Sequence, residues 1–508
     1  MSHESEATMT LAELRSSGVG GRLMGSPAQR IRGVHHDSRS VVDGDLFVAV
    51  TGQSHDGLRF VDDALTRGAV AVMAERPIER DVPQLIVEDA RVGLGLAAEL
   101  VYGSPTSRLH TVGITGTNGK TTTAYLLKQA IEKGSGKAAL IGTTGLFVGA
   151  TEVDSAHTTP EGDDISRFAR DALRAGATHL VLEVSSHGLA MRRVDAIDLE
   201  IAAFTNLSRD HLDFHDTFEE YGDAKARLFT ELLPKRAVVN VDDPFGAEIA
   251  IRAAMPVVRC SRRPQSDAEI VATEWSATRA GIEATVDTPK GSVRLRSPML
   301  GEHNLENLLV ALGCVHALGL DIDRAVEAWR EASGSPGRLE QIAHPRDVAV
   351  LVDYAHTPDA LHRVLDAMRA ITPGRLIVVF GAGGDRDRGK RPQMGQAAAE
   401  RADLCVITSD NPRSESPQDI LDEVEAGARN AGMPRCEPEE LSTTARGYCC
   451  VLDRRAAIKA AIRSAREGDT VLLAGKGHET YQIVGTKRFR FDDRQEAQAA
   501  IADLGGGA

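Results

Sequence analysis

A glycine-rich segment, GTNGKTT at 116–122, combines one lysine with hydroxyl side chains directly after an apolar run. Small residues allow backbone N–H groups to close around a polyphosphate, and the start of a helix adds positive potential. Lys120 would neutralise phosphate charge, and the Thr121 hydroxyl would reach a magnesium ion. This combination predicts the binding of a nucleoside triphosphate.

The residues around this segment predict the elements that a phosphate loop needs. Ala124, Leu127 and Ile131 recur at helical spacing in the stretch that follows. The standard phosphate-loop pattern has a glycine where this chain has Ile114, so we expect a variant loop. The alternative is a glycine turn without a ligand, and the flanking strand and helix patterns argue against it.

Carboxylates and imidazoles follow two further apolar runs. EVSSH at 183–187 places Glu183 at the end of one run, and NLSRDHLDFH at 206–215 adds Asp210, His211, Asp213 and His215. A carboxylate and an imidazole on neighbouring strand ends could hold magnesium bridged by phosphate oxygens. Because histidine is an unusual magnesium ligand, a structural role for His211 stays open. Lys225, in the helical stretch that follows, would by itself be interpreted as a solvated surface lysine.

The last third of the chain carries charged groups of both signs after its apolar runs. Asp353 could accept ribose hydroxyls and Tyr354 could pack beside a base, whereas a loop ion pair and a core tyrosine are the alternatives. A zwitterionic amino acid needs guanidinium groups for its carboxylates and carboxylates for its ammonium groups. Three further segments offer both kinds: GAGGDRDRGKRP at 381–392 with Arg386, Arg388, Lys390 and Arg391, DNPR at 410–413, and AGKGHE at 474–479 with Glu479.

These polar segments follow short apolar runs that alternate with helical stretches. Continuous apolar runs of this length indicate strands of a mainly parallel sheet covered on both faces, so the expected fold class is α/β. In such sheets ligands bind beyond the carboxyl ends of the strands. The expected strands are 46–50, 110–116, 179–186, 201–208, 349–356, 376–384, 404–410 and 470–477.

The length and the turn-rich segments predict three domains. YGSPTS at 102–107 would close a small N-terminal α/β domain, 1–107, and the Gly, Ser and Pro residues at 332–338 indicate a linker. A central domain, 108–335, and a C-terminal domain, 336–508, would complete the chain.

The composition limits the class of partner. A net charge of -14 argues against a general nucleic-acid or membrane-surface role. The N-terminus, MSHESEATMT, lacks the basic and apolar regions of an export signal, and no apolar stretch approaches the ~18 residues of a membrane span. We therefore expect a cytoplasmic monomer whose six cysteines are reduced thiols, with no nucleic-acid partner and no membrane insertion.

The order of the motifs resembles that of the Mur ligases. GTNGKTT, EVSSHGL, NLSRDHLDFH, GEHNLENLLVA at 301–311, GRLE at 337–340, DYAHTPDAL at 353–361, GAGGDRDRGKRP, DNPR and AGKGHE follow one another as in that family. The resemblance extends from HDSR at 36–39 to AGKGHE. It implies an N-terminal UDP-sugar-binding domain, a central P-loop ATPase-type parallel sheet and a Rossmann-like C-terminal domain that binds an amino acid.

The resemblance also implies an ATP and magnesium site. Thr121 and Glu183 would hold one Mg²⁺, and His211 would hold a second one together with Lys225, carboxylated by CO2. Lys120, Glu183, His211 and Lys225 would be the catalytic residues. ATP would be bound by Gly116, Thr117, Asn118, Gly119, Lys120, Thr121, Thr122, Asn304, Arg338 and Asp353.

Two further ligands follow from the same resemblance. The UDP-muramoyl dipeptide would contact His36, Ser38, Gln53, Ser54, His55, His157, Thr158, Thr159, Ser185, Met191 and Arg193. At two of these positions, His157 and Met191, other family members often carry asparagine and glutamine. Diaminopimelate would contact Arg386, Asp410, Asn411, Pro412, Arg413, Gly475 and Glu479.

Arg413 decides which amino acid the resemblance predicts. In the family the DNPR motif accompanies meso-diaminopimelate, whereas lysine-adding relatives generally lack the arginine. Lysine has no second carboxylate, so a buried guanidinium would lose its partner at a cost of about 2–5 kcal/mol. The expected reaction is therefore ATP-dependent addition of meso-2,6-diaminopimelate to the D-glutamate of UDP-N-acetylmuramoyl-L-alanyl-D-glutamate through an acyl phosphate, in peptidoglycan synthesis.

Several alternatives to this reaction remain. A lysine-adding ligase and a folylpolyglutamate synthetase share the chemistry, but HDSR and the QSHDG segment at 53–57 favour a UDP-sugar over folate. A nucleotide-dependent binding module without catalysis predicts missing metal or amino-acid residues, yet Glu183, His211, Lys225 and Arg413 are all present. A UDP-sugar transferase that does not use ATP has no use for the phosphate loop.

Overall fold

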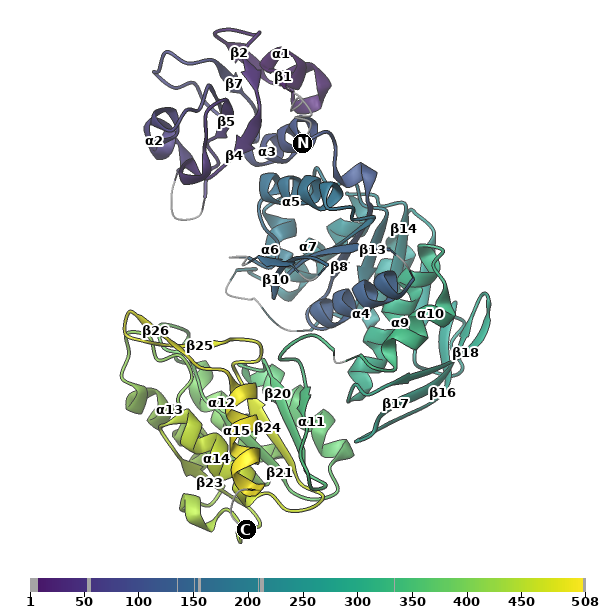
Figure 1. The fold of residues 1–508 in the computed structure, drawn as a ribbon, viewed down its shortest axis with the longest axis vertical. Helices are drawn as coiled ribbons and strands as arrows, with labels where there is room; N and C mark the ends of the chain where they lie inside the picture. Colours follow the sequence, from purple (N-terminus) through teal and green to yellow (C-terminus); the bar gives the residue numbers. More distant parts are fainter. Residues whose placement is uncertain are drawn as a thin grey trace. The chain divides into compact units, whose positions relative to one another are not determined.

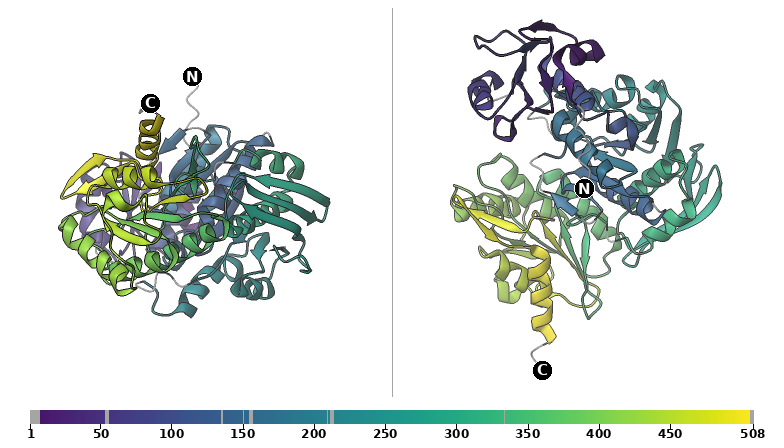
Figure 2. Two further views of the ribbon diagram at one scale, coloured as in Figure 1. Left: turned by 90° about the horizontal axis from the view of Figure 1, so that it is seen from below. Right: turned by 45° about the horizontal axis from the view of Figure 1, so that its top comes forward.

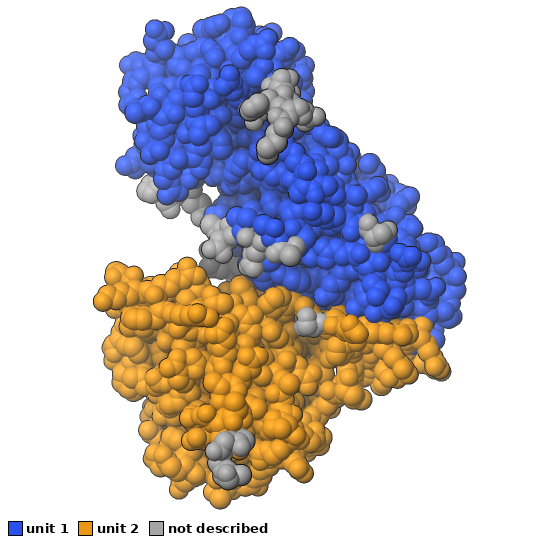
Figure 3. Space-filling model, viewed as in Figure 1, with its two compact units in different colours: residues 1–273, 285–293, 306–329 blue, residues 274–284, 294–305, 330–508 orange. Residues whose placement is uncertain are grey.

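The computed structural model describes residues 8–52, 56–134, 136–149, 151–153, 157–208, 210, 214–332 and 334–505. They form two compact units, drawn in blue and orange in Figure 3. The first unit comprises Met1–Thr273, Thr285–Val293 and Glu306–Trp329, and the second comprises Glu274–Ala284, Arg294–Leu305 and Arg330–Ala508. The division into three domains stays a prediction.

The beginning of the first unit contains a five-stranded sheet in the order β2-β7-β6-β5-β4. β4 to β7 run parallel, and β2 pairs antiparallel with β7. Asp89 caps helix α3 by accepting hydrogen bonds from the N–H groups of Arg91 and Val92. The elements are β1 (Met9–Thr10), α1 (Leu11–Leu14), a π-helical turn (Arg15–Val19), β2 (Arg22–Met24), β3 (Arg30–Ile31), β4 (Gly33–His35), a 3-10 turn (Ser38–Ser40), β5 (Asp45–Val48), a 3-10 turn (Gly57–Phe60), α2 (Val61–Thr66), β6 (Ala71–Ala74), β7 (Gln84–Ile86), α3 (Ala90–Val101) and a 3-10 turn (Thr106–Arg108).

An eleven-stranded sheet follows, in the order β11-β10-β9-β12-β8-β13-β14-β15-β16-β17-β18. β9, β12, β8, β13, β14, β15 and β16 are parallel, and β10 and β11 form an antiparallel edge. The strands are β8 (His110–Thr115), β9 (Ala138–Gly142), β10 (Gly145–Val148), β11 (Thr151–Val153), β12 (His179–Glu183), β13 (Ile201–Phe204), β14 (Arg236–Asn240), β15 (Val257–Ser261), β16 (Ile270–Thr278), β17 (Gly281–Thr288) and β18 (Gly291–Ser297).

Helices cover both faces of this sheet. On one face, apolar residues of α5, α7 and α8 form a buried cluster with alternate residues of the strands. On the other face α4 and α10 pack together (Figure 1). Trp329 at the end of α10 donates a hydrogen bond of 2.9 Å to the Leu126 carbonyl. The helices are α4 (Lys120–Lys133), α5 (Gly162–Arg174), α6 (Ser186–Ala190), α7 (Phe218–Thr230), α8 (Pro244–Arg252), α9 (Glu302–Ala317) and α10 (Ile322–Trp329).

The second unit contains a six-stranded sheet in the order β19-β20-β24-β21-β22-β23. β20 to β24 are parallel, and β19 pairs antiparallel with β20. Figure 2 shows its helices from two further directions. The elements are β19 (Glu340–Ile342), β20 (Ala349–Asp353), α11 (Pro358–Ile371), β21 (Leu376–Phe380), α12 (Lys390–Arg401), β22 (Leu404–Ile407), α13 (Pro417–Asn430), a 3-10 turn (Pro438–Glu440), β23 (Gly447–Cys450), α14 (Arg454–Ser464), β24 (Thr470–Ala474), β25 (Tyr481–Val484), β26 (Lys487–Arg490) and α15 (Asp493–Gly505).

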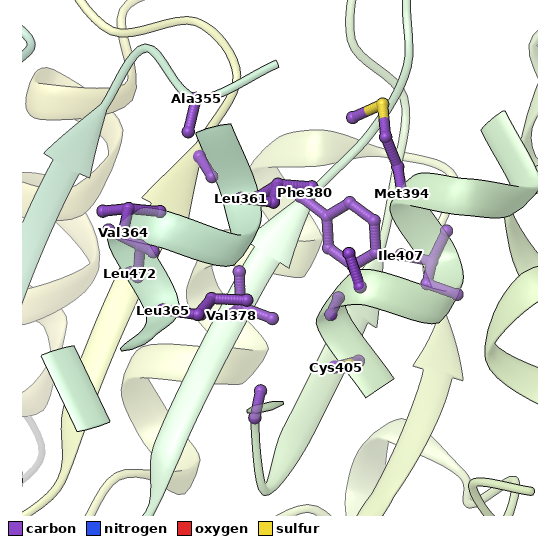
Figure 4. Packing of buried hydrophobic residues seen from close by; sticks show 14 of the residues in the cluster. Ala355, Leu361, Val364, Leu365, Val378, Phe380, Met394, Cys405, Ile407 and Leu472 are labelled. Atoms are coloured by element: carbon purple, nitrogen blue, oxygen red, sulfur yellow. The ribbon is translucent and has the colours of Figure 1, made fainter. Parts of the chain in front are cut away.

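Two apolar clusters hold this sheet between helices. Leu361, Val364 and Leu365 of α11 and Met394 of α12 pack on one face, against strand residues that include Phe380 (Figure 4). α14 and α15 pack on the other face through a second cluster. Because both faces are covered, the strand interiors are apolar throughout, and only the loops at the strand ends can carry polar chemistry.

The eight expected strands and the α/β class are confirmed. The eight predicted segments correspond to β5, β8, β12, β13, β20, β21, β22 and β24, and each strand ends one to four residues before the predicted end. The polar ends of those segments thus form loops. The strands β14 to β18 between 236 and 297 were not predicted, and in β16 to β18 buried and exposed positions alternate. In the described residues, no helix combines the length and the apolar character that crossing a membrane requires.

Candidate active site

The loop at 116–119 connects β8 to α4, as the phosphate-binding pattern predicts. Gly116 (φ 150°) and Gly119 (φ 85°) have backbone conformations that favour glycine. A Cβ atom at Gly116 would lie 1.9 Å from Oγ1 of Thr205, and one at Gly119 would lie 2.2 Å from Oδ1 of Asn307. Only glycine fits at these two positions, so the variant spacing is part of a tightly packed loop.

The end of β13 holds the phosphate loop in place. The N–H group of Thr117 donates to the Asn206 carbonyl at 2.8 Å, and that of Asn118 donates to Oδ1 of Asn206 at 3.0 Å. Oγ1 of Thr117 accepts hydrogen bonds from the Ser208 N–H group (2.9 Å) and the Tyr221 hydroxyl (3.0 Å). The segment that contains Asn206 and Ser208 therefore fixes the loop rather than extending freely into solvent.

Lys120 and the two threonines after it begin α4. The Lys120 ammonium donates to the carbonyls of Gly116 and Thr117, both at 2.9 Å, so it lies against the loop that it would help to neutralise. Thr121 and Thr122 are buried in the first helical turn. The Thr121 hydroxyl donates to Oε2 of Glu183 at 2.9 Å, which brings the two expected magnesium ligands into direct contact.

Glu183 is a fully buried carboxylate at the end of β12. Besides Thr121, it accepts hydrogen bonds from the Thr143 N–H group on Oε1 (3.0 Å) and from the Thr143 hydroxyl on Oε2 (3.1 Å). A Cβ atom on Gly142 would lie 2.1 Å from Oε1 of Glu183, so this strand end must also be glycine. Thr143 was not predicted as a site residue, because a threonine after an apolar run is a common turn residue.

Lys225 is buried, contrary to the interpretation of this lysine as a solvated surface residue. Its side chain is among the largest fully buried ones, and its Nζ donates to the Gly116 carbonyl at 2.9 Å. It also lies 4.5 Å from the centre of the Tyr221 ring. Burial, and next the positive charge of Lys120, lower the pKa of Lys225 well below its usual value. Among the described residues it forms no ion pair.

The expected dipeptide side of the site is a connected network. Oγ1 of Thr159 donates to the Glu183 carbonyl at 2.8 Å and accepts from the Ser185 N–H group at 2.9 Å. Arg193 donates to the Thr159 carbonyl and to Oε1 of Glu161, both at 2.9 Å. Thr158 is hydrogen-bonded to Thr143 at 3.1 Å, His157 is exposed, and Met191 is half-buried. Of these residues, Thr158, Thr159, Ser185 and Arg193 are therefore linked to Glu183.

Glu161 and Asp163, which were not predicted, join this network to the N-terminal sheet. Glu161 pairs with Arg91 at the start of α3, as well as with Arg193. The carboxylate of buried Asp163 accepts from Nδ1 of His36 at 2.9 Å and from the His36 N–H group at 3.1 Å. Glu161 lies 70 residues from Arg91 and Asp163 lies 127 residues from His36 in the sequence, so no local pattern could identify them.

Four of the expected residues of the first unit lie outside the described residues. They are Gln53, Ser54, His55 and His211. Ser38, in contrast, is buried in a 3-10 turn whose N-cap is Asp37.

His36 predicts a pH dependence of stability. Burial opposes protonation of the ring, but the hydrogen bond to Asp163 and nearby carboxylates outweigh it and raise the pKa of His36 to about 9. Because this pKa exceeds the ordinary value of 6.5, the charged pair contributes its full stabilisation below about pH 6.5 and loses it as the pH rises through about 9. Thermal unfolding of the wild type should therefore show a larger drop in Tm between pH 6.5 and 9 than His36→Asn. Equal drops would contradict the assignment.

The expected nucleotide residues of the second unit surround Asp353 and Tyr354. Asp353, at the end of β20, accepts hydrogen bonds from the N–H groups of Leu339 (2.9 Å) and Ala355 (2.8 Å). The guanidinium of Arg338 lies 4.9 Å from the centre of the Tyr354 ring. Asn304 is buried and donates to the Leu300 carbonyl at 2.8 Å. Tyr354 is half-buried and stacks with Arg338, so it is not an ordinary core tyrosine.

The expected amino-acid residues meet at the ends of β22 and β24. Asn411 donates from Nδ2 to Oε2 of Glu479 at 2.9 Å. Oδ2 of Asp410 is buried and has no hydrogen-bond partner among the residues that the structure describes, and a Cβ atom on Gly475 would lie 2.8 Å from it. Because Gly475 has no side chain, there is room beside Oδ2 of Asp410, as a bound ammonium group requires. The structure thus brings Asp410, Asn411, Gly475 and Glu479 together.

The loop after β21 contributes to the same region. Arg413 (φ 51°) donates from Nη1 to the Gly384 carbonyl at 2.8 Å, and a Cβ atom on Gly384 would lie 1.9 Å from the Pro412 carbonyl oxygen. Arg386 is exposed, and within the described residues its guanidinium donates only to the neighbouring Asp385 carbonyl, at 3.4 Å.

Arg391, from the same arginine-rich segment, has a structural role. It is fully buried and donates to Glu415 at 2.7 Å and to Glu423 at 2.9 Å. Arg388 pairs with Glu423 as well. These two arginines tie the loop to α13, and only Arg386 of the segment's arginines lacks a carboxylate partner in the described part of the chain.

Comparisons with known proteins agree with this arrangement. The family models described as Mur ligase family, catalytic domain, as Mur ligase middle domain, and as Mur ligase, glutamate ligase domain match residues 30–102, 114–315 and 337–477.

Two curated relatives named UDP-N-acetylmuramoyl-L-alanyl-D-glutamate–2,6-diaminopimelate ligase match almost the full chain. The one from Geobacter metallireducens is 45% identical and covers 94% of this chain and 96% of its own length. The one from Geobacter sulfurreducens is 43% identical with the same coverage. A solved structure with this name is 34% identical, with a TM-score of 0.72, and covers 98% of this chain and 100% of its own. The chain belongs to the Mur ligase family.

Proposed function

We propose that the chain is an ATP-dependent ligase that joins meso-2,6-diaminopimelate to the D-glutamate of UDP-N-acetylmuramoyl-L-alanyl-D-glutamate. The observation that carries this proposal is the arrangement around the phosphate loop. There the Thr121 hydroxyl contacts the Glu183 carboxylate at 2.9 Å, and buried Lys225 contacts the loop carbonyl of Gly116 at 2.9 Å. The names of relatives up to 45% identical support the choice of substrates. The monomeric state stays a prediction.

In the first step, a carboxylate oxygen of D-glutamate attacks the γ-phosphorus of ATP. The bond between this phosphorus and the β–γ bridging oxygen breaks, which leaves ADP and an acyl phosphate. Both reactants are anions, so their approach must be offset by positive charge. The Lys120 ammonium supplies such charge at the loop, where it already lies 2.9 Å from two loop carbonyls. The N–H groups at the start of α4 add to it.

In the second step, an unprotonated amine of diaminopimelate attacks the carbonyl carbon of the acyl phosphate. Phosphate leaves with the bonding electrons, the attacking nitrogen loses a proton, and an amide results. The side chains of the second unit would bind the far end of the amino acid, with Asp410 and Glu479 on its ammonium group and Arg413 on its carboxylate. The protein thus positions and neutralises charge, and the reaction needs no side-chain nucleophile.

The residues present fit magnesium. Thr121 and Glu183 offer adjacent oxygens, which is the donor type that magnesium prefers. They would hold one ion, and His211 and carboxylated Lys225 would hold a second. Bound magnesium would offset the charge of the ATP phosphates.

The surroundings of Lys225 fit carboxylation. An amine must be neutral to attack CO2, and the product is a carbamate anion plus a proton. Lys225 is fully buried, and its burial and the nearby cation Lys120 lower its pKa despite the opposing charge of Asp210, so its charged form is disfavoured and an anion in its place is favoured. This would convert a buried cation into a metal ligand.

Product analysis tests the proposed function. Purified protein, ATP, magnesium and the UDP-dipeptide are incubated with either meso-diaminopimelate or L-lysine, and mass spectrometry identifies the product. We expect the amide with diaminopimelate, because bound L-lysine would leave the Arg413 guanidinium without a carboxylate partner. An amide with lysine alone would make the chain a lysine-adding ligase. ADP release without any amide would overturn the proposal.

A further inference from the structure

Lys476 is a buried cation within the expected amino-acid site. It lies in the turn after β24, between Gly475 (φ 116°) and Gly477 (φ 51°), and its side chain is 0% exposed. Burying an ammonium group is costly unless it is paired, so its partners must matter. In the described part of the chain its one ion pair is with Oε2 of Glu479, at 3.1 Å.

This ion pair holds one oxygen of Glu479 and leaves the other available. Oε2 of Glu479 accepts from the Lys476 ammonium and also from Nδ2 of Asn411, at 2.9 Å. Oδ1 of Asn411 in turn lies 3.4 Å from the Lys476 ammonium and accepts from the Ile483 N–H group at 2.9 Å. Oε1 of Glu479 makes no hydrogen bond to any described residue, and the side chain is 16% exposed. The carboxylate is thus held by one edge.

The second acidic group of this region is also incompletely satisfied. Oδ2 of Asp410 is buried beside Gly475 and accepts no hydrogen bond from the described part of the chain. Two carboxylate oxygens, on Asp410 and Glu479, are therefore available to a ligand with an ammonium group. The Lys476 ammonium itself is fully buried, and it donates to Asn411 and Glu479.

We propose that Lys476 is a positioning and specificity-determining residue of the amino-acid site. It holds Glu479 in the orientation that receives the ammonium group, and its buried charge offsets one of the two carboxylates. Meso-diaminopimelate carries two carboxylates and two ammonium groups, whereas L-lysine carries one more positive charge than carboxylates. A site that retains the Lys476 charge therefore favours the diamino diacid, and this inference rests on the proposed function.

Variants of the two partners of this ion pair distinguish an effect of charge on binding from a general loss of structure in the site. Lys476→Met removes the cation and keeps a long side chain, so the site becomes one unit more negative. Glu479→Gln removes the anion and keeps the shape, so the site becomes one unit more positive. The measured quantity is a discrimination ratio, the inhibition constant of L-lysine divided by the KM of meso-diaminopimelate, in the full protein with saturating ATP and UDP-dipeptide.

We expect Lys476→Met to raise the KM of meso-diaminopimelate by about tenfold. The discrimination ratio should fall by more than about tenfold, because the inhibition constant of lysine also falls when the site becomes more negative. The KM values for ATP and for the UDP-dipeptide should change less than about twofold, since their expected residues do not contact Lys476. For Glu479→Gln the ratio should rise or stay constant, even though the KM of diaminopimelate increases.

Three outcomes would overturn the inference: a ratio that is unchanged in Lys476→Met, KM values for all three substrates that rise together, or a ratio that falls in both variants. If Lys476→Met does not fold, Glu479→Gln alone tests the inference: a discrimination ratio that rises or stays constant supports it, and a ratio that falls overturns it. The proposed function is tested separately, because it fails only when the wild type makes no diaminopimelate amide.

Discussion

Lys225→Met is expected to lower kcat by about a thousandfold without destabilising the protein. The activity falls because a charged group that serves the transferring phosphoryl group contributes about 10²–10³-fold. The stability is retained because the lysine is fully buried and, among the described residues, has a single hydrogen bond, to the Gly116 carbonyl. Methionine fills similar space and needs no solvation of a charge. The rate of amide formation and the Tm, measured on the same sample, test the expected loss of activity and the expected retention of stability.

A matched lysine controls for the loss of a side chain from the first unit. Lys128 of α4 is also partly buried and pairs with Glu132 at 2.8 Å, but it does not contact the phosphate loop. Lys128→Met should retain at least half of the wild-type activity. A carbon-13 NMR signal of a carbamate, seen with labelled bicarbonate in the wild type, should disappear in Lys225→Met. Full activity of Lys225→Met, or a carbamate signal that persists in it, would remove Lys225 from the mechanism.

The second large effect concerns the buried pair of Arg454 and Asp493 in the second unit. Arg454 donates to Asp493 from Nε at 2.8 Å and from Nη2 at 2.6 Å, and both side chains are 0% exposed. Arg454 also donates to the carbonyls of Ala474 (3.0 Å) and Ser409 (3.5 Å), which precede Gly475 and Asp410 in the sequence. The pair therefore joins α14 and α15 to the strand ends that carry the expected amino-acid site.

Arg454→Met is expected to destabilise the second unit by about 3–5 kcal/mol, because it leaves the Asp493 carboxylate buried without its cation. The double variant Arg454→Met/Asp493→Leu removes both charges and should recover most of this loss, to within about 1–2 kcal/mol of the wild type, the remainder reflecting the lost bonds to the two carbonyls. The free energy of unfolding is measured by denaturant titration, with amide hydrogen exchange in α14 as the readout for the second unit. A double variant less stable than the single one would mean that the pair itself stabilises the fold.

The phosphate loop and Lys225 show which features of the site the local sequence can predict and which it cannot. The phosphate loop was predicted because an apolar run, a glycine turn and a helical repeat are adjacent in the chain, and the structure places Gly116 and Lys120 accordingly. Lys225 was interpreted as solvated, because its helix shows polar residues around it and burial depends on the loop 109 residues earlier. The family resemblance, rather than the local pattern, predicted its role.

The sequence by itself determined the α/β class, the positions of the eight predicted strands and the polar loops at their ends, because hydrophobic runs and helical spacing act over a few residues. Only the tertiary structure decided which of the polar residues are buried and paired. His36 meets Asp163 across 127 residues, Asn411 meets Glu479 across 68, and Arg454 meets Asp493 across 39. The charge state and orientation of a side chain depend on neighbours brought together by folding, so these pairings could not be read from spacing along the chain.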